Sequence, residues 1–63
     1  MGKLTVEQWR HIRGYTQKQL ADLIGMKCAT YQTKESGKRK WSANELKDIA
    51  QVLNVSIENE LEY

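Results

Sequence analysis

One local pattern occurs three times in this chain: an apolar residue, Thr or Ser, two further residues, Gln or Glu, and a second apolar residue. It spans residues 4–9, 15–20 and 41–46. In such a capping box the hydroxyl accepts a hydrogen bond from the third amide of a helix, while Gln or Glu reaches back to the amide of the capping residue. The two apolar residues pack together as a hydrophobic staple. The pattern therefore predicts three helix starts.

Glycines mark where helices end. Gly14, Gly25 and Gly37 each follow a helical stretch, at the position where a left-handed residue costs least. Together with the caps, they predict helices over residues 6–13, 17–24, 28–36 and 43–53, and a fifth short helix near 57–62.

Helical spacing also predicts which side chains turn inward. The second helix has one apolar stripe and the fourth helix has another: Leu20, Leu23 and Ile24, and Leu46, Ile49, Ala50 and Leu53. The β-branched clusters are short and adjoin caps, so no strand is expected. The chain is thus predicted to form one all-α, five-helix domain over residues 1–63.

The composition indicates the cellular compartment in which a chain like this is expected to fold. The one cysteine has no partner within the chain, so disulfides cannot staple the fold, and the cysteine indicates a reducing cytoplasm or a free thiol. No apolar run approaches the roughly 20 residues of a membrane span, and the N-terminus lacks the apolar region of a signal peptide. A core of this size rarely supplies more than about 3–5 kcal/mol of stability, and an obligatory partner subunit is one source of the remainder. We expect a cytoplasmic domain with no membrane contact.

Charge is distributed unevenly along the chain. Residues 1–40 hold nine Lys and Arg against three acidic residues, a net charge of +6, whereas residues 41–63 hold one Lys against five Glu and Asp, a net charge of −4. The basic part is expected to face a polyanion.

Between residues 28 and 36, the outward positions of the predicted helix carry short, mostly uncharged side chains. They are Cys28, Ala29, Gln32 and Thr33. A solvated helix face normally carries Glu and Lys instead. These residues therefore suggest a helix face that meets another molecule.

The segments RGYTQKQLADLIGM, TYQTKESGKRK and ELKDIAQVLNVSIENEL resemble the lambda-repressor-like helix-turn-helix domain, the Cro and repressor class of phage and bacterial regulators. The resemblance runs from about Val6 to Leu61. It implies that the second helix opens at the DNA backbone and that the third helix enters the major groove. Compact side chains suit that groove, because long acidic ones would be repelled by the phosphates.

The resemblance assigns base reading to Cys28, Ala29, Gln32 and Thr33. Gln32 is expected to form two hydrogen bonds with an adenine edge. Ala29 and the Thr33 methyl group are expected to contact thymine methyl groups. An operator rich in A·T at the read positions is the corresponding expectation.

It assigns contacts with the DNA backbone to a second set of residues: Gln17, Lys27, Lys38, Arg39, Lys40 and Arg13. Gln17 is expected to give its amide to a phosphate, helped by the positive end of the second helix. Binding through such contacts weakens steeply with salt.

The family also pairs an arginine of the first helix with a glutamate of the third, and Arg10 and Glu35 stand at those positions. Such a pair is expected to fix the recognition helix against the body of the domain. Three residues depart from the family pattern, and one of them is Glu60, which stands where an apolar residue is more usual. Lys27 replaces a serine-like cap, and Lys34 replaces a large apolar residue, so its stem is expected to pack while its ammonium reaches outward.

The function expected from these features is that of a sequence-specific transcriptional regulator, a small phage- or plasmid-type repressor that blocks polymerase by occupying its operator. A homodimer would read an inverted repeat. Its expected contact surface lies in the C-terminal third, around Val55, Ile57, Leu61 and Tyr63.

Two other classes remain as alternatives. The same fold also suits a protein-binding module, such as an antitoxin subunit or an antirepressor. An enzyme is the weaker alternative, because no nucleophile-base set, paired-carboxylate site or phosphate loop is recognisable. His11 and Cys28 make no metal set, and neither a cofactor nor a metal is expected.

Overall fold

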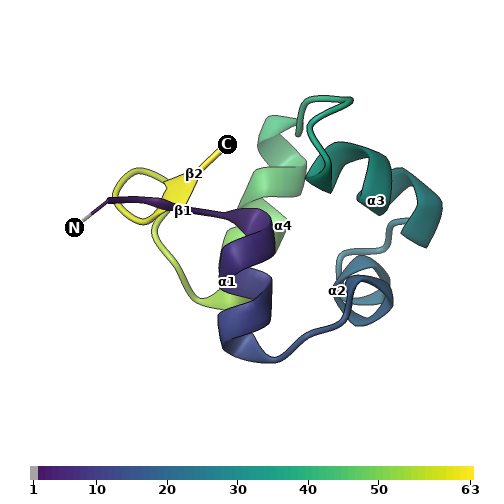
Figure 1. Ribbon diagram of the computed structural model, residues 1–63, viewed down its shortest axis with the longest axis horizontal. Helices are drawn as coiled ribbons and strands as arrows, with labels where there is room; N and C mark the ends of the chain where they lie inside the picture. The colour runs from purple at the N-terminus through teal and green to yellow at the C-terminus, as the bar shows by residue number, and fades with distance from the viewer. Residues whose placement is uncertain (1) are drawn as a thin grey trace.

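The computed structural model describes residues 2–63, in which four helices surround one core and two short strands join the ends of the chain (Figure 1). In chain order the elements are β1 (Leu4–Thr5), α1 (Val6–Arg13), α2 (Gln17–Leu23), α3 (Cys28–Glu35), α4 (Ala43–Leu53) and β2 (Leu61–Glu62). Within this part of the chain, no helix has the length and apolar character needed to cross a membrane.

All three predicted capping boxes are formed. The hydroxyls of Thr5, Thr16 and Ser42 accept hydrogen bonds from the amides three residues onward, at 3.2, 3.1 and 3.1 Å. The Gln or Glu side chain returns to the capping amide in each case. Each hydroxyl cap stabilises the domain by about 1 kcal/mol. Lys27 precedes α3 without any side-chain cap, so this helix depends on tertiary contacts instead.

Left-handed residues close all four helices, and after α2 this residue is Gly25, with a φ of 71°. Gly14 follows α1 with a φ of 80°, Gly37 follows the last turn of α3 with a φ of 88°, and Asn54 ends α4 with a φ of 57°. The predicted roles of Gly14, Gly25 and Gly37 are confirmed, since a side chain is disfavoured at such angles.

The core is formed by apolar side chains from all four helices and from β2: Val6, Leu20, Ala21, Tyr31, Leu46, Ile49, Ala50, Leu53 and Leu61. The predicted inward stripe of α4 is confirmed. In α2 the prediction is wrong for Leu23, whose side chain is 56% exposed. Ala21 instead shares the inward face with Leu20, because about 100° per residue turns Leu23 away from a face centred on these two residues.

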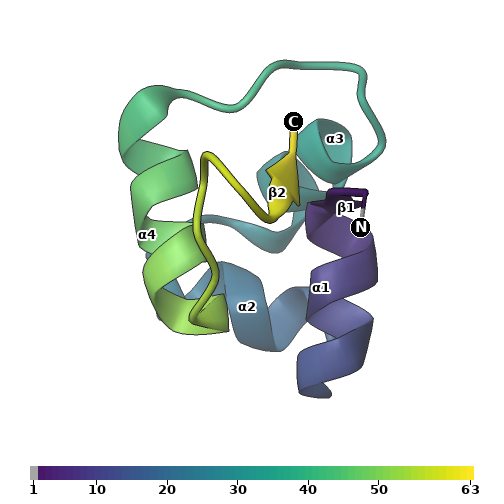
Figure 2. The ribbon, with the colours of Figure 1, turned by 90° about the vertical axis from the view of Figure 1, so that its left-hand side faces the viewer.

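The C-terminal segment differs from the prediction. Residues 57–60 form a turn, and Leu61 then enters β2, which pairs in parallel with β1 opposite Leu4. The Glu60 carbonyl accepts hydrogen bonds from the Leu4 amide at 3.1 Å and from Trp9 Nε1 at 2.7 Å. These contacts draw the chain back across the molecule toward its N-terminal end (Figure 2). The predicted fifth helix is therefore wrong, as is the expectation of no strand.

The physical reason is that a helix of six residues gains too little from its own hydrogen bonds to persist alone. An extended backbone after Glu60 instead buries Leu61 completely and satisfies polar groups of β1. Tertiary contacts thus outweigh the local helical preference of this segment.

Candidate nucleic-acid interface

Helices α2 and α3 are joined by a short turn over residues 24–27. Gly25 adopts a φ of 71°, and the Met26 amide donates a hydrogen bond to the Ala21 carbonyl at 2.8 Å. Because the turn returns to the end of α2, it fixes the start of α3. Helix α3 lies at the edge of the molecule, away from the paired strands (Figure 1).

The four residues with predicted base-reading roles lie on α3. Ala29 and Gln32 are exposed, and Cys28 and Thr33 are half-buried. The Thr33 hydroxyl donates to the Ala29 carbonyl at 2.9 Å, so it is satisfied within the helix. The outward face of α3 thus carries a thiol, two methyl-bearing side chains and one amide, and no charge.

The acidic residue of α3 is turned inward. Glu35 accepts hydrogen bonds from Arg10 Nε at 3.0 Å, Arg10 Nη2 at 3.2 Å and Gln17 Nε2 at 2.9 Å, and also from the Tyr31 hydroxyl. The Arg10 and Glu35 side chains are only 7% and 2% exposed. This ion pair connects α1 with α3, and its negative member is hidden from any ligand of α3.

Two opposing effects act on the Glu35 carboxyl. Burial raises its pKa, but the hydrogen bonds from Arg10, Tyr31 and Gln17 lower it, and the net result is a pKa below the ordinary value. Glu35 is therefore ionised at neutral pH. Burial and the nearby carboxylate raise the pKa of Tyr31, which keeps its hydroxyl protonated and able to donate.

The Gln17 amide also reaches α3 at a second point. Its Oε1 atom accepts a hydrogen bond from Gln32 Nε2 at 3.0 Å. Gln17 thus lies between the buried Glu35 and the exposed Gln32, and one hydrogen on its Nε2 atom remains for another acceptor. Gln17, which was predicted to contact the DNA backbone, thus lies directly beside Gln32, which was predicted to read bases.

Two basic residues make contacts inside the domain. Arg13 donates from Nε to the Leu53 carbonyl at 2.7 Å and lies over the Trp9 ring at 4.9 Å, so it joins α1 to α4. The structure does not group it with α3. The Lys34 ammonium contacts the Glu45 carboxylate at 2.5 Å, and its side chain is only 12% exposed. The expectation that this ammonium reaches outward is therefore wrong.

The remaining basic residues with predicted backbone roles surround α3. Lys27 directly precedes the helix, and Lys38, Arg39 and Lys40 follow it. All four are exposed, and within residues 2–63 none of them forms a salt bridge. Both ends of α3 thus carry positive charge that is not neutralised within the described part of the chain.

Sequence reasoning missed two contributors to this arrangement. Tyr31 is fully buried, and its hydroxyl holds Glu35 from the preceding turn of the same helix. The four-residue spacing between them was the available signal. The Lys34–Glu45 pair carried no comparable signal, since it joins two helices across a loop.

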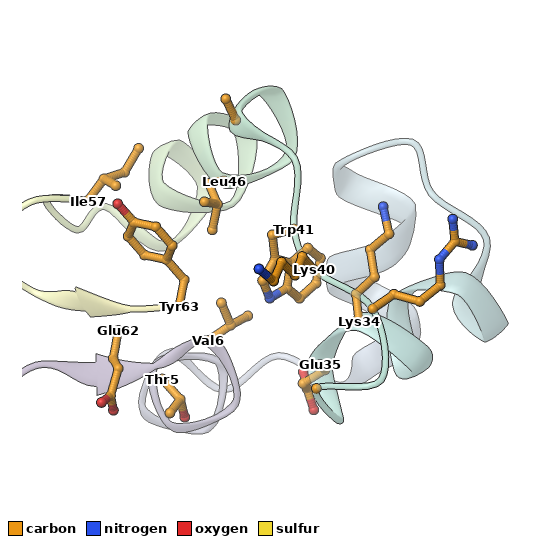
Figure 3. A pocket seen from close by; sticks show the side chains of 13 residues that line it. Thr5, Val6, Lys34, Glu35, Lys40, Trp41, Leu46, Ile57, Glu62 and Tyr63 are labelled. Carbon is orange, nitrogen blue, oxygen red and sulfur yellow. The ribbon is translucent and has the colours of Figure 1, made fainter.

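A groove of about 770 Å³ lies between the paired strands and the loop that joins α3 to α4. Its apolar lining includes Val6, Trp41, Leu46, Ile57 and Tyr63 (Figure 3). Lys40 lies beside Trp41, Lys34 lies on the α3 side, and Glu62 lies on the side of the paired strands (Figure 3).

A helix-turn-helix family model matches residues 6–59, which include all four helices. No curated protein and no solved structure matches the chain. The family match covers most of the sequence and agrees with a compact, mostly helical fold. The protein belongs to the Cro/C1-type helix-turn-helix family of DNA-binding regulators.

Proposed function

We propose that this domain binds duplex DNA sequence-specifically with α3 in the major groove, and that it represses transcription by occupying an operator. One arrangement carries the proposal. The uncharged outer face of α3 is flanked at both ends by exposed cations, while the acidic Glu35 is buried against Arg10. Such a helix offers no repulsion to the two phosphate chains that border the groove.

Base reading is assigned to the exposed face of α3. The Gln32 amide has a donor and an acceptor to present to an adenine edge, and its bond to Gln17 orients it. The Ala29 and Thr33 methyl groups suit thymine methyls, because the Thr33 hydroxyl is already bonded within the helix. Cys28 lies one turn before Gln32 on the same face.

Phosphate contacts are assigned to Gln17 and to the four exposed cations. Gln17 has one amide hydrogen left after bonding Glu35. Lys27 lies before α3, and Lys38, Arg39 and Lys40 lie after it, so the two groups suit phosphates on opposite sides of a groove. Arg13 is left out, since Leu53 and Trp9 occupy its guanidinium.

A homodimer on an inverted repeat is part of the proposal. The partner is a second copy of this chain, docked beside the apolar groove. Two observations support it. Within residues 2–63, β2 pairs with β1 along one edge and has no partner strand along its other edge. Tyr63, which directly follows β2, is 71% exposed.

The experiment is selection from randomised duplex DNA with the purified protein, at about 50 and 200 mM salt. Enrichment of an inverted repeat, with half-sites about 34 Å apart or a multiple of that distance, is the expected result. Failure to enrich any sequence at either salt concentration contradicts operator binding. A protein partner recovered in its place would favour the antitoxin or antirepressor alternative.

A further inference from the structure

The loop between α3 and α4 carries three of the exposed cations on a backbone with few bonds of its own. It arches from the end of α3 to the start of α4 (Figure 2). Its first residues are held, because the Gly37 and Lys38 amides donate to carbonyls of α3 at 3.1 and 3.2 Å. In the described part of the chain, the amides of Arg39, Lys40 and Trp41 donate no hydrogen bond. Local backbone bonding therefore does not fix where Arg39 and Lys40 lie.

A partly buried ion pair spans the base of this loop. Lys34, in the last turn of α3, places Nζ 2.6 and 2.5 Å from the two carboxylate oxygens of Glu45, in the first turn of α4. The two side chains are 12% and 22% exposed, so salt screens the pair less than it screens a surface pair.

The same carboxylate also caps α4. Glu45 Oε1 accepts a hydrogen bond from the Ser42 amide at 2.7 Å. Lys34 above all, and Ser42 after it, lower the pKa of Glu45, which keeps it ionised at neutral pH. One carboxylate thus joins the end of α3 to the beginning of α4 and closes the loop between them.

We infer that the Lys34–Glu45 pair positions the basic loop, defined as residues 38–40, so that its cations meet the DNA backbone. Lys34 and Glu45 are then positioning residues, which act on DNA only through the loop that they close. This inference rests on the proposed DNA binding, because the loop needs a polyanion to contact.

Glu45→Gln separates this role from simple electrostatics. The substitution removes a negative charge, so long-range attraction alone would make DNA binding tighter. It also keeps the capping box, since Gln serves at that position as well as Glu. Loss of loop positioning has the opposite effect and weakens binding. The two explanations therefore predict opposite signs for one variant.

Asp48→Asn is the matched control. Asp48 is exposed on the same helix, and its side chain makes no hydrogen bond or salt bridge within residues 2–63. This variant removes the same charge without touching the loop. Lys34→Arg and Lys34→Met form a second pair, since Arg retains the contact with Glu45 and Met keeps only the apolar stem.

Duplex DNA binding is measured for the full chain and the variants between about 50 and 200 mM salt. Glu45→Gln and Lys34→Met are expected to bind several-fold more weakly, with the salt slope reduced by about 0.9 for each lost phosphate contact. Asp48→Asn and Lys34→Arg are expected to bind duplex DNA about as tightly as the unmodified chain, or more tightly. Glu45→Gln binding as tightly as Asp48→Asn would overturn the inference.

Backbone ¹⁵N relaxation of the DNA-free protein tests the positioning separately. The basic loop is expected to become more mobile in Glu45→Gln and Lys34→Met, and to stay unchanged in Asp48→Asn. Unchanged loop relaxation in the first two variants would also overturn the inference. If the unmodified chain binds no duplex DNA, the proposed function fails, and relaxation alone decides whether the pair orders the loop.

Discussion

Arg10 and Glu35 meet through two hydrogen bonds, of 3.0 and 3.2 Å, in a contact that is almost completely shielded from solvent. Arg10 also donates from Nη1 to the Tyr15 carbonyl at 2.8 Å, so its guanidinium is satisfied on several sides. A buried pair of this kind serves less to add stability than to fix one arrangement, because desolvation offsets much of the attraction. Here it fixes α3 against α1 and removes the acidic charge from the outer face of α3.

Removing one partner of this ion pair is expected to destabilise the domain strongly. Glu35→Gln leaves the Arg10 charge buried without its counterion and should lower the free energy of unfolding by about 3–5 kcal/mol. Urea denaturation at pH 7 measures the change. Glu58→Gln is the control, because Glu58 is exposed, and it should stay within about 0.5 kcal/mol of the unmodified chain. Similar stability of the two variants would contradict a structural role for the pair.

Lowering the pH should reduce the stability of the domain, because it protonates the Glu35 carboxylate. The folded-state pKa of Glu35 lies below its ordinary value of 4.5, so its stabilising contribution is fully present above the unfolded-state pKa and is lost as the pH falls through the folded-state pKa. The stability difference between the unmodified chain and Glu35→Gln should therefore shrink as the pH drops below 4.5. Denaturation series at several pH values measure this difference. The Glu45 contribution cancels, since both proteins contain Glu45. A difference that stays constant down to low pH would count against the assignment.

Substitutions at Thr33 test whether its methyl group contacts a base. Thr33→Val keeps a branched side chain of the same size and loses only a hydroxyl that is bonded to Ala29. Thr33→Ala removes the methyl group as well. If the methyl group meets a thymine, Thr33→Ala should change the preference at one base step, whereas Thr33→Val should retain it. Repeating the DNA selection with each variant measures both preferences. Identical selected sequences for all three proteins would remove Thr33 from the reading set.

Lys38 should behave differently if it contacts a phosphate as proposed, because such a contact carries no sequence information. Lys38→Ala is expected to weaken binding to specific and random duplexes alike and to reduce the salt slope by about 1. Binding isotherms on both duplexes across a salt series measure the two effects. Lys18→Ala is a charge-matched control on α2, where Lys18 already pairs with Asp22 at 3.4 Å. A loss confined to one sequence would contradict the backbone role of Lys38.

Tyr63 tests the proposed dimer. Tyr63→Ser removes an exposed ring beside the apolar groove and should shift the protein toward monomer at a given concentration. Sedimentation equilibrium measures the shift. Ile12→Ser is the control, since Ile12 is 56% exposed on α1 and does not line the groove. Equal association of both variants and the unmodified chain would exclude this contact surface.

All four helices could be predicted from local patterns in the amino-acid sequence. Caps and left-handed glycines act within a few residues, so Thr5, Thr16 and Ser42 predicted three helix starts correctly. The inward face of α4 was predictable for the same reason, because its stripe follows from helical spacing alone. The uncharged outer positions of α3 were also visible in the sequence, and α3 carries them as an outward-facing set of exposed or half-buried residues.

The contacts that hold these helices together could not be predicted in this way, because they form only in the folded chain. Leu61 enters the core from a strand because β1 and Trp9 supply partners that a six-residue helix would leave unused. The Lys34 ammonium turns to Glu45 because another helix brings a carboxylate within reach. Such contacts join residues far apart in the chain, and their free energy depends on desolvation and geometry, which no local pattern encodes.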